Sequence, residues 1–350
     1  MKRINLLDLG RFIASLIVLL YHYFQNGINH GKVNSIGFTE PISSIVKYGY
    51  IGVPFFFMIS GYVIYYSAFN KSAYDFLVSR MKRLYPSYWT AIIFTSVVAY
   101  FLGAGTEMAV TLKQILANFT MIQRFLGVEN VDGVYWTLLY ELKFYILVFL
   151  ILFFSNEKVL LTFFKIWPAL ILLSFITGQF KFLFDHQFSY FSFGLLIAMY
   201  NINKSRTVVL PLLLSVGLSV YAINLRSESV TDYIVYSSMV ITFMAFFYSL
   251  MFDSISNIKV KNSYILGALT YPMYLIHAHF GYMVLNRYAT ESNKLFVYAF
   301  LFASVIVLSY LIHHYIEVKM KNVWHSLFSK ALLPVRYAEQ IYKKRLTTAR

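Results

Sequence analysis

Ten apolar segments dominate this sequence and leave few folds open to it. An α-helix needs about 20 consecutive, mostly apolar residues to cross the hydrocarbon core of a membrane. Segments of this kind, bounded by charged or turn residues, occupy residues 12–27, 51–69, 88–105, 135–154, 159–178, 188–200, 208–224, 233–251, 264–285 and 297–316. The sequence therefore predicts an all-α, polytopic integral membrane bundle of about ten transmembrane helices.

The composition excludes an ordinary soluble enzyme. Only 13% of the 350 residues are charged and 59% are hydrophobic, whereas soluble domains carry about 25% charged residues. The chain has no cysteine, which excludes disulfides, thiolate nucleophiles and cysteine metal sites. Any catalysis must therefore use histidine, carboxylates, hydroxyls or cations.

Segment lengths and linkers predict a single membrane domain. Residues 188–200 form the shortest segment, which would span only by tilting or by thinning the bilayer. The first segment is not expected to be a cleaved signal peptide, because no small-residue cleavage site follows it. No internal repeat or linker is evident, so residues 1–328 are assigned to a transmembrane domain and residues 329–350 to a basic cytoplasmic tail.

The net charge of +15 raises the question of a polyanionic partner. A nucleic-acid partner would need a soluble basic face, so none is expected, whereas the lipid bilayer is an expected partner. With both termini in the cytoplasm, 20 of the 30 cations fall on the cytoplasmic side, 8 on the opposite side and 2 within segments. The positive-inside rule predicts this asymmetry, which explains most of the excess charge.

Polar residues at membrane depth are candidates for function. Arg11 and His22 are eleven positions apart, so on a helix they share a face and lie about 16 Å from each other along the axis. Arg11 is expected at the cytoplasmic boundary and His22 well inside the membrane. A topology anchor and a buried, hydrogen-bonded histidine are the structural alternatives for these two residues.

A second candidate group lies before the third segment, where Arg80 and Arg83 share a helix face beside Lys82. Guanidinium groups bind phosphates well, although contacts with lipid headgroups would also explain these cations. Glu141 is the only acidic residue placed inside a segment, and a structural salt bridge is its alternative role. Residues 49–64 combine bulky side chains with a small-residue notch, which favours close helix packing.

Several catalytic signatures are missing. No two histidines stand at positions i and i+3 or i and i+4, so a helical metal site has no local support. The sequence contains neither a Gly-x-Ser-x-Gly elbow nor a phosphate loop. No bound metal or cofactor is expected.

Six motifs, taken together and in order, resemble the acyltransferase-3 family of integral membrane acyltransferases. They are LDLGRFIA at 7–14 followed by His22, GVPFFFMISGY at 52–62, RMKRLYP at 80–86, YWT at 135–137 through Glu141 to Phe144 and Tyr145, YPMYLIH at 271–277, and YIE at 315–317. Lys143 departs from the glutamate or glutamine that is common in the family, and Leu139 and Tyr140 stand where smaller residues are common. Many members carry an appended soluble domain, which these 350 residues are not expected to contain.

The resemblance implies transfer of an acyl group, most often acetyl, from cytosolic acyl-coenzyme A to a hydroxyl of a glycan or lipid-linked sugar, such as O-antigen or exopolysaccharide. The enzyme is expected in a bacterial cytoplasmic (inner) membrane, with acyl-coenzyme A as co-substrate. The residues that the resemblance assigns are His22 and Glu141 as catalytic, Arg11, Arg80, Lys82 and Arg83 as acyl-coenzyme A ligands, and Asp8, Ser60, Trp136, Tyr145 and His277 as supporting.

The mechanism that follows is a hypothesis with open branches. His22 acts as general base on the acceptor hydroxyl or as a transient acyl carrier, and Glu141 orients its imidazole or stabilises the imidazolium. A transporter or exporter of a glycan or small molecule is the leading alternative, but neither inverted repeats nor paired broken helices are evident. A glycan polymerase is a second alternative, and it would be expected to have larger outward loops.

Overall fold

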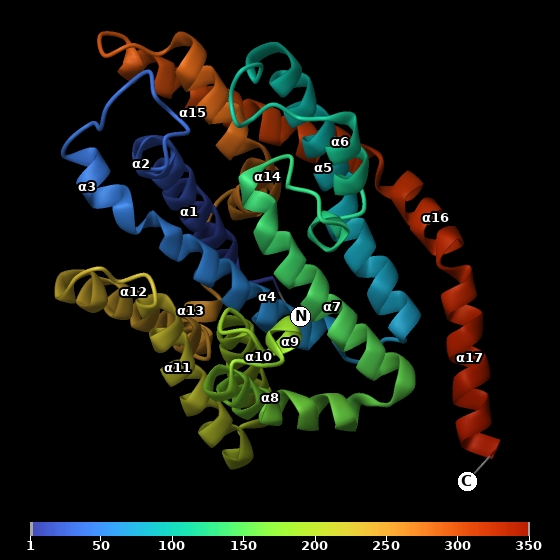
Figure 1. Ribbon diagram of the computed structural model, residues 1–350. Coiled ribbons are helices and arrows are strands. Elements are labelled where there is room, and N and C mark those ends of the chain that lie inside the picture. Colours follow the sequence, from blue (N-terminus) through green and yellow to red (C-terminus); the bar gives the residue numbers. More distant parts are fainter. Residues whose placement is uncertain (1–2, 349–350) are drawn as a thin grey trace.

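The computed structural model describes residues 3–348, and that part of the chain is helical with connecting turns and contains no strand (Figure 1). Lys2 and Arg350, two of the cations assigned to the cytoplasmic side, lie outside the described residues. The longer helices are α1 (Asn5–Tyr21), α4 (Gly52–Ala68), α5 (Ala73–Leu102), α7 (Trp136–Phe154), α8 (Glu157–Thr177), α10 (Phe188–Asn203), α11 (Val209–Asn224), α12 (Val230–Ser249), α14 (Ser263–Tyr288), α15 (Lys294–Leu311), α16 (Lys321–Ala331) and α17 (Leu333–Thr348).

Short helical pieces connect these elements. They are α2 (Gly27–Asn29), α3 (Ile42–Val46), α6 (Leu112–Asn118), α9 (Lys181–Phe184) and α13 (Asp253–Ser256), with 3₁₀ turns η2 (Lys47–Ile51), η3 (Gln123–Leu126), η4 (Gly133–Tyr135) and η5 (Arg206–Val208). Two π-helical segments, η1 (His22–Asn26) and η6 (Ile312–Lys319), continue α1 and α15.

All ten predicted segments are helical, which confirms the all-α prediction. Within residues 3–348, seven helical stretches are long and apolar enough to cross a membrane: Asn5–Asn29, Ile42–Ala68, Gly133–Phe154, Glu157–Thr177, Arg206–Asn224, Val230–Ser249 and Lys294–Lys319. Helices α5 and α14 are longer than most of these but do not reach the same apolar character, and α10 is shorter. The structure thus fits a multi-pass membrane protein, while the count of ten and the side of the termini stay predictions.

The shortest predicted segment is a core helix. Helix α10 has 16 residues, so it is about 24 Å long against a hydrocarbon core of about 30 Å. Every residue from 188 to 199 is buried, with α4, α8 and α11 packed around it. A helix that is apolar on all sides is stable when protein surrounds it, so the surrounding helices account for its apolar composition.

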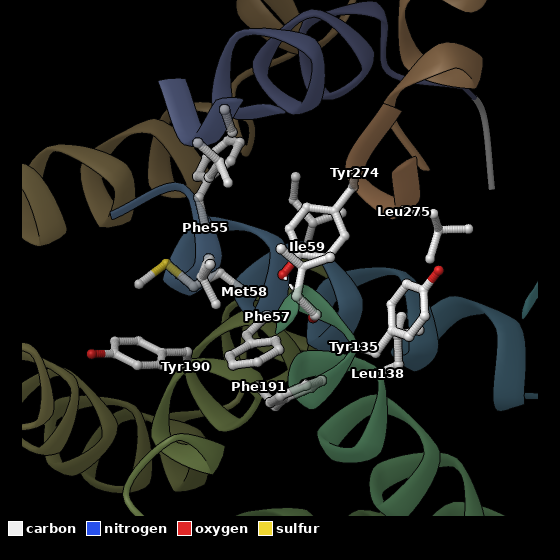
Figure 2. Packing of buried hydrophobic residues seen from close by; sticks show 14 of the residues in the cluster. Phe55, Phe57, Met58, Ile59, Tyr135, Leu138, Tyr190, Phe191, Tyr274 and Leu275 are labelled. Atoms are coloured by element: carbon white, nitrogen blue, oxygen red, sulfur yellow. Dashed lines mark hydrogen bonds between the residues drawn. The ribbon is translucent and has the colours of Figure 1, made fainter. Parts of the chain in front are cut away.

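Helix α4 lies at the centre of the packing, with α10 on one side and α7 and α14 nearby (Figure 2). The rings of Phe57 and Phe191 stack between α4 and α10 with centroids 4.5 Å apart. A Cβ atom on Gly61 would overlap the Phe191 carbonyl oxygen, and one on Gly194 would overlap the Met58 carbonyl oxygen. This backbone contact confirms that the small-residue notch in residues 49–64 serves close helix packing.

Helices α16 and α17 run along one side of the bundle (Figure 1) and contact α5. The carboxylate of Glu339 accepts hydrogen bonds from the backbone N–H groups of Ala73 and Tyr74, at 3.0 and 2.9 Å. These amides belong to the first turn of α5, where backbone donors lack helical partners. The predicted boundary between residues 328 and 329 falls inside α16.

Candidate active site

A cavity of about 440 Å³ lies among α1, α4, α5, α7, α14 and η6. We call it the arginine cavity. Its polar lining comprises Arg11, Ser60, Ser79, Arg80, Lys82, Arg83, Thr137, Glu141, Tyr145, Thr270, Tyr271, Tyr274, Glu317 and Lys321. The structure therefore brings together all four cations predicted to bind acyl-coenzyme A, which come from α1 and α5.

The arginines of this cavity are not fully paired within the protein. The Arg83 guanidinium lies 3.8 Å from the Glu317 carboxylate, whereas no ion pair within the described residues involves Arg11 or Arg80. The Nε atoms of Arg11 and Arg80 are buried and have no hydrogen-bond partner in the described part of the chain. Buried donors without partners are rare, so these atoms point to an anionic ligand that completes the site.

Lys82 adds to the positive charge at the edge of the cavity. Its ammonium lies 3.3 Å from the Nδ1 atom of His325 on α16. Partial burial, together with repulsion from Lys321 and Lys71, lowers the pKa of Lys82. A polyanion bound here would offset that repulsion.

Glu317 is a cavity residue that sequence reasoning did not assign, although it ends the motif at 315–317. Its carboxylate accepts hydrogen bonds from the Ser87 hydroxyl and the His313 Nδ1 atom, both at 2.7 Å. The bond from Ser87 ties η6 to α5 one turn beyond Arg83, and the bond from His313 lies within η6. Glu317 thus positions the guanidinium of Arg83, which also lies over the Tyr271 ring.

Glu141 faces the arginine cavity from α7. Its carboxylate accepts hydrogen bonds from the Ser60 hydroxyl at 2.5 Å and from the Tyr145 hydroxyl at 3.2 Å. Two predicted supporting residues therefore contact the predicted catalytic carboxylate. Lys143 points elsewhere, toward the rings of Tyr140 and Phe182, as the two-residue spacing predicts.

A second cavity of about 160 Å³ contains His22, and we call it the histidine cavity. It is lined by Tyr21, His22, Asn26, Lys32, Tyr50, Val53, Gly133, Val134, Trp136, Arg226, Tyr274, Ala278, His279 and Tyr282. Arg11 and His22 thus line different cavities, as their axial separation of about 16 Å on α1 requires.

The imidazole of His22 is held by a carbonyl and a second histidine. Its Nδ1 atom lies 2.8 Å from the Val18 carbonyl oxygen and 3.3 Å from the Nε2 atom of His277. The Nδ1 atom of His277 lies 2.8 Å from the Tyr274 carbonyl oxygen. Because a carbonyl can only accept, both Nδ1 atoms are assigned the proton, and the Nε2 atom of His22 is left as a free base.

Local backbone geometry brings the two histidines together. The π-helical segment η1 begins at His22, and such segments often mark functional sites. The next residue, Tyr23, packs where a Cβ on Gly281 would otherwise lie, and its hydroxyl donates to the His277 carbonyl at 2.9 Å. These contacts hold the end of α1 close against α14.

Val53 and Tyr274 line both cavities and therefore form the wall between them. The hydroxyl of Tyr274 lies 2.9 Å from the Oγ1 atom of Thr137, which fixes the ring across the bundle. Glu141 and His22 stand in different cavities and share no hydrogen bond among the described residues. The interpretation that Glu141 orients the imidazole therefore lacks support, and Val18 and His277 make the orienting contacts instead.

Residues 4–314 match the acyltransferase-3 family, described as an acyltransferase domain. The chain belongs to this family. The match covers nearly the whole transmembrane part, including the histidine cavity and all of the arginine cavity except Glu317 and Lys321, and agrees with the resemblance that the motifs indicate.

A similar curated protein is the O-acetyl transferase of Shigella phage Sf6, which is 32% identical over 104 residues. The alignment covers 29% of this chain and 27% of the phage protein, so it spans about a quarter of that relative. No solved structure matches the chain. Family membership and this relative support O-acyltransferase activity in a multi-pass membrane protein.

Three further polar or aromatic residues make defined contacts in this family member. Trp136 lies parallel to Tyr50 in the histidine cavity, with an interplanar angle of 3°. Asp8 pairs with Arg3 at 2.6 Å near the start of α1. Asp132 was not predicted because it precedes the apolar segment; it is fully buried, and its carboxylate accepts from the backbone N–H groups of His279 and Val134.

Proposed function

We propose that this protein transfers an acyl group, acetyl in the first instance, from cytosolic acyl-coenzyme A to a hydroxyl of a cell-surface or lipid-linked glycan. The arginine cavity carries the proposal, because it gathers Arg11, Arg80, Lys82 and Arg83 and leaves two buried guanidinium donors unpaired. Coenzyme A is a polyanion, and guanidinium groups bind phosphate through paired N–H donors. The volume of the arginine cavity, about 440 Å³, lies in the usual range for ligand sites.

The histidine cavity supplies the base in one route. The Nε2 atom of His22 takes the proton of the acceptor hydroxyl while the hydroxyl oxygen forms a bond to the acyl carbon. The thioester C–S bond then breaks, and the departing thiolate receives the proton from the imidazolium to give free coenzyme A. A positioned general base of this kind contributes about 10²- to 10⁴-fold to the rate.

A second route uses His22 as an acyl carrier. Its Nε2 atom attacks the thioester carbonyl and the C–S bond breaks. The departing thiolate takes the proton that the acyl-imidazolium loses from Nδ1, so coenzyme A leaves as the thiol and a neutral acyl-imidazole remains. The acceptor hydroxyl then attacks the acyl carbon, the C–N bond breaks, and the hydroxyl proton passes to the imidazole. Both routes need the thioester to reach His22 past Val53 and Tyr274, which line both cavities. Intact-protein mass spectrometry distinguishes the routes, because only the carrier route gives an acylated protein without acceptor.

Glu141 belongs to the donor side in this proposal. Held by Ser60 and Tyr145, its carboxylate faces the cations of the arginine cavity. It balances part of their charge, so that coenzyme A can leave after transfer. The acceptor enters the histidine cavity from the opposite face, where the loops at 28–50 and 106–134 border it in the predicted topology.

The direct test uses purified protein in nanodiscs, labelled acetyl-coenzyme A and a panel of lipid-linked glycans, with the label located by mass spectrometry. Folded His22→Ala protein is expected to transfer no label, whereas His30→Ala, which changes an exposed histidine outside both cavities, retains transfer. Parallel reactions with succinyl-coenzyme A test the acyl group. Wild-type transfer rates in His22→Ala, or solute transport without thioester consumption, would overturn the proposal.

A further inference from the structure

The histidine cavity contains two cations that have no acidic partner. Lys32 and Arg226 line it, and no ion pair within the described residues involves either of them. Three other cations on the same predicted side are paired: Lys47 with Asp232 at 3.1 Å, Arg124 with Glu129 at 2.6 Å, and Lys294 with Glu291 at 2.7 Å. What distinguishes Lys32 and Arg226 is that both line one cavity, beside His22.

The acidic side chains close to this cavity lie outside its lining. Asp132 is fully buried, and its carboxylate accepts from the backbone N–H groups of His279 and Val134. Its oxygens thus hold η4 against α14. No carboxylate lines the histidine cavity, so Lys32 and Arg226 carry the formal charges of the lining itself.

Arg226 is also held in an orientation that suits an anion. Its guanidinium carbon lies 3.6 Å from the centroid of the Tyr50 ring, and Tyr50 in turn lies parallel to Trp136. Stacking covers the flat face of a guanidinium but leaves its N–H edge free to bind a carboxylate or phosphate. The Lys32 ammonium lies 5.9 Å from the Tyr282 ring, on the other side of the lining.

We propose that the acceptor is an anionic sugar, bearing a carboxylate or a phosphate, whose charge is bound by Arg226 and Lys32 while a hydroxyl faces His22. This inference rests on the proposed function and names its acceptor class. The cavity of about 160 Å³ is smaller than most ligand sites, so only one end of a longer glycan would enter it. Trp136 adds apolar surface to the lining.

The test compares acceptors that differ only in charge: an oligosaccharide with a terminal uronic acid, the same oligosaccharide with the carboxyl reduced to an alcohol, and its phosphorylated form. Wild-type kcat/KM is expected to be roughly tenfold or more higher for the charged acceptors, as for a hydrogen bond to a charged group. The ratio of kcat/KM for charged acceptors to kcat/KM for the neutral acceptor is expected to fall toward one in Arg226→Gln and to be partly kept in Arg226→Lys. It is expected to be unchanged in Arg287→Gln, since Arg287 is exposed and lies outside the cavity.

The outcomes separate this inference from the function on which it rests. Equal kcat/KM for charged and neutral acceptors would overturn the anionic-sugar proposal and leave acyl transfer intact. Absence of transfer to every acceptor, with no thioester consumption, would instead overturn the proposed function. If Arg226→Gln has an effect only in nanodiscs that contain anionic lipid, Arg226 and Lys32 bind lipid headgroups instead of the acceptor, and the inference is overturned.

Discussion

At the scale of single residues, the pairing of His22 with His277 determines which nitrogen can react. The carbonyl oxygens of Val18 and Tyr274 place a proton on each Nδ1 atom, so His277 presents an unprotonated Nε2 atom to the Nδ1–H of His22. His277 is therefore a positioning residue. It holds the imidazole of His22 in the tautomer whose Nε2 atom carries no proton.

Removal of this acceptor tests the positioning role. His277→Leu is expected to lower kcat roughly fivefold, because about 1 kcal/mol of hydrogen bonding to the reacting imidazole is lost. His277→Gln retains an acceptor oxygen and is expected to recover most of that loss. KM for acyl-coenzyme A should stay at the wild-type value in both, measured by steady-state kinetics with the purified variants. A change in KM alone would show that His277 acts on donor binding.

At the scale of helices, the contact between α4 and α10 depends on two glycines. Gly61→Ala and Gly194→Ala each place a Cβ against a backbone carbonyl oxygen of the other helix. The expected loss of stability is about 1–3 kcal/mol for each change, as for other overpacked cores. Lower thermal unfolding temperatures in detergent would confirm it.

Gly217→Ala in α11 is the matched control, since no atom lies within 4 Å of the position that its Cβ would occupy. A helical glycine replaced by alanine in open space is expected to stabilise by about 0.5–1 kcal/mol. Equal effects at all three glycines would contradict the packing argument.

Helix α17 supports the start of α5, the helix that carries three of the cations proposed to bind acyl-coenzyme A. Glu339→Ala removes the acceptor for the amides of Ala73 and Tyr74 and is expected to cost about 1 kcal/mol at that helix terminus. Hydrogen exchange should then rise in residues 73–79, with a several-fold increase in KM for acyl-coenzyme A. The exposed Glu107, changed to alanine, provides the control. Unaltered exchange in Glu339→Ala would show that the cap is dispensable.

The elements also show what could be predicted from the sequence. Long apolar runs define helices because each helix satisfies its own backbone, so the all-α fold followed directly. The shared cavity of Arg80 and Arg83 followed from their spacing on one helix. The contact between His22 and His277 joins residues 255 positions apart, and no local periodicity predicts such a pair. The burial of α10 was missed for the same reason.

At the scale of the whole molecule, the cation distribution predicts which face each loop occupies. The absence of cysteine allows single cysteines to report this without background. Lys71→Cys is expected to react with a membrane-impermeant maleimide only after permeabilisation, and Lys113→Cys is expected to react in intact cells; both native lysines are exposed. The opposite labelling pattern would invert the topology and place the arginine cavity away from cytosolic coenzyme A.

The wall made by Val53 and Tyr274 bears on whether ions could leak across the membrane through the two cavities. In the predicted topology, two polar cavities reach into the bilayer from opposite faces, with these side chains bordering both. A continuous water path there would discharge the membrane. In the proposed function only the acyl group passes from one cavity to the other, so Val53 and Tyr274 can exclude water and ions there while transfer proceeds.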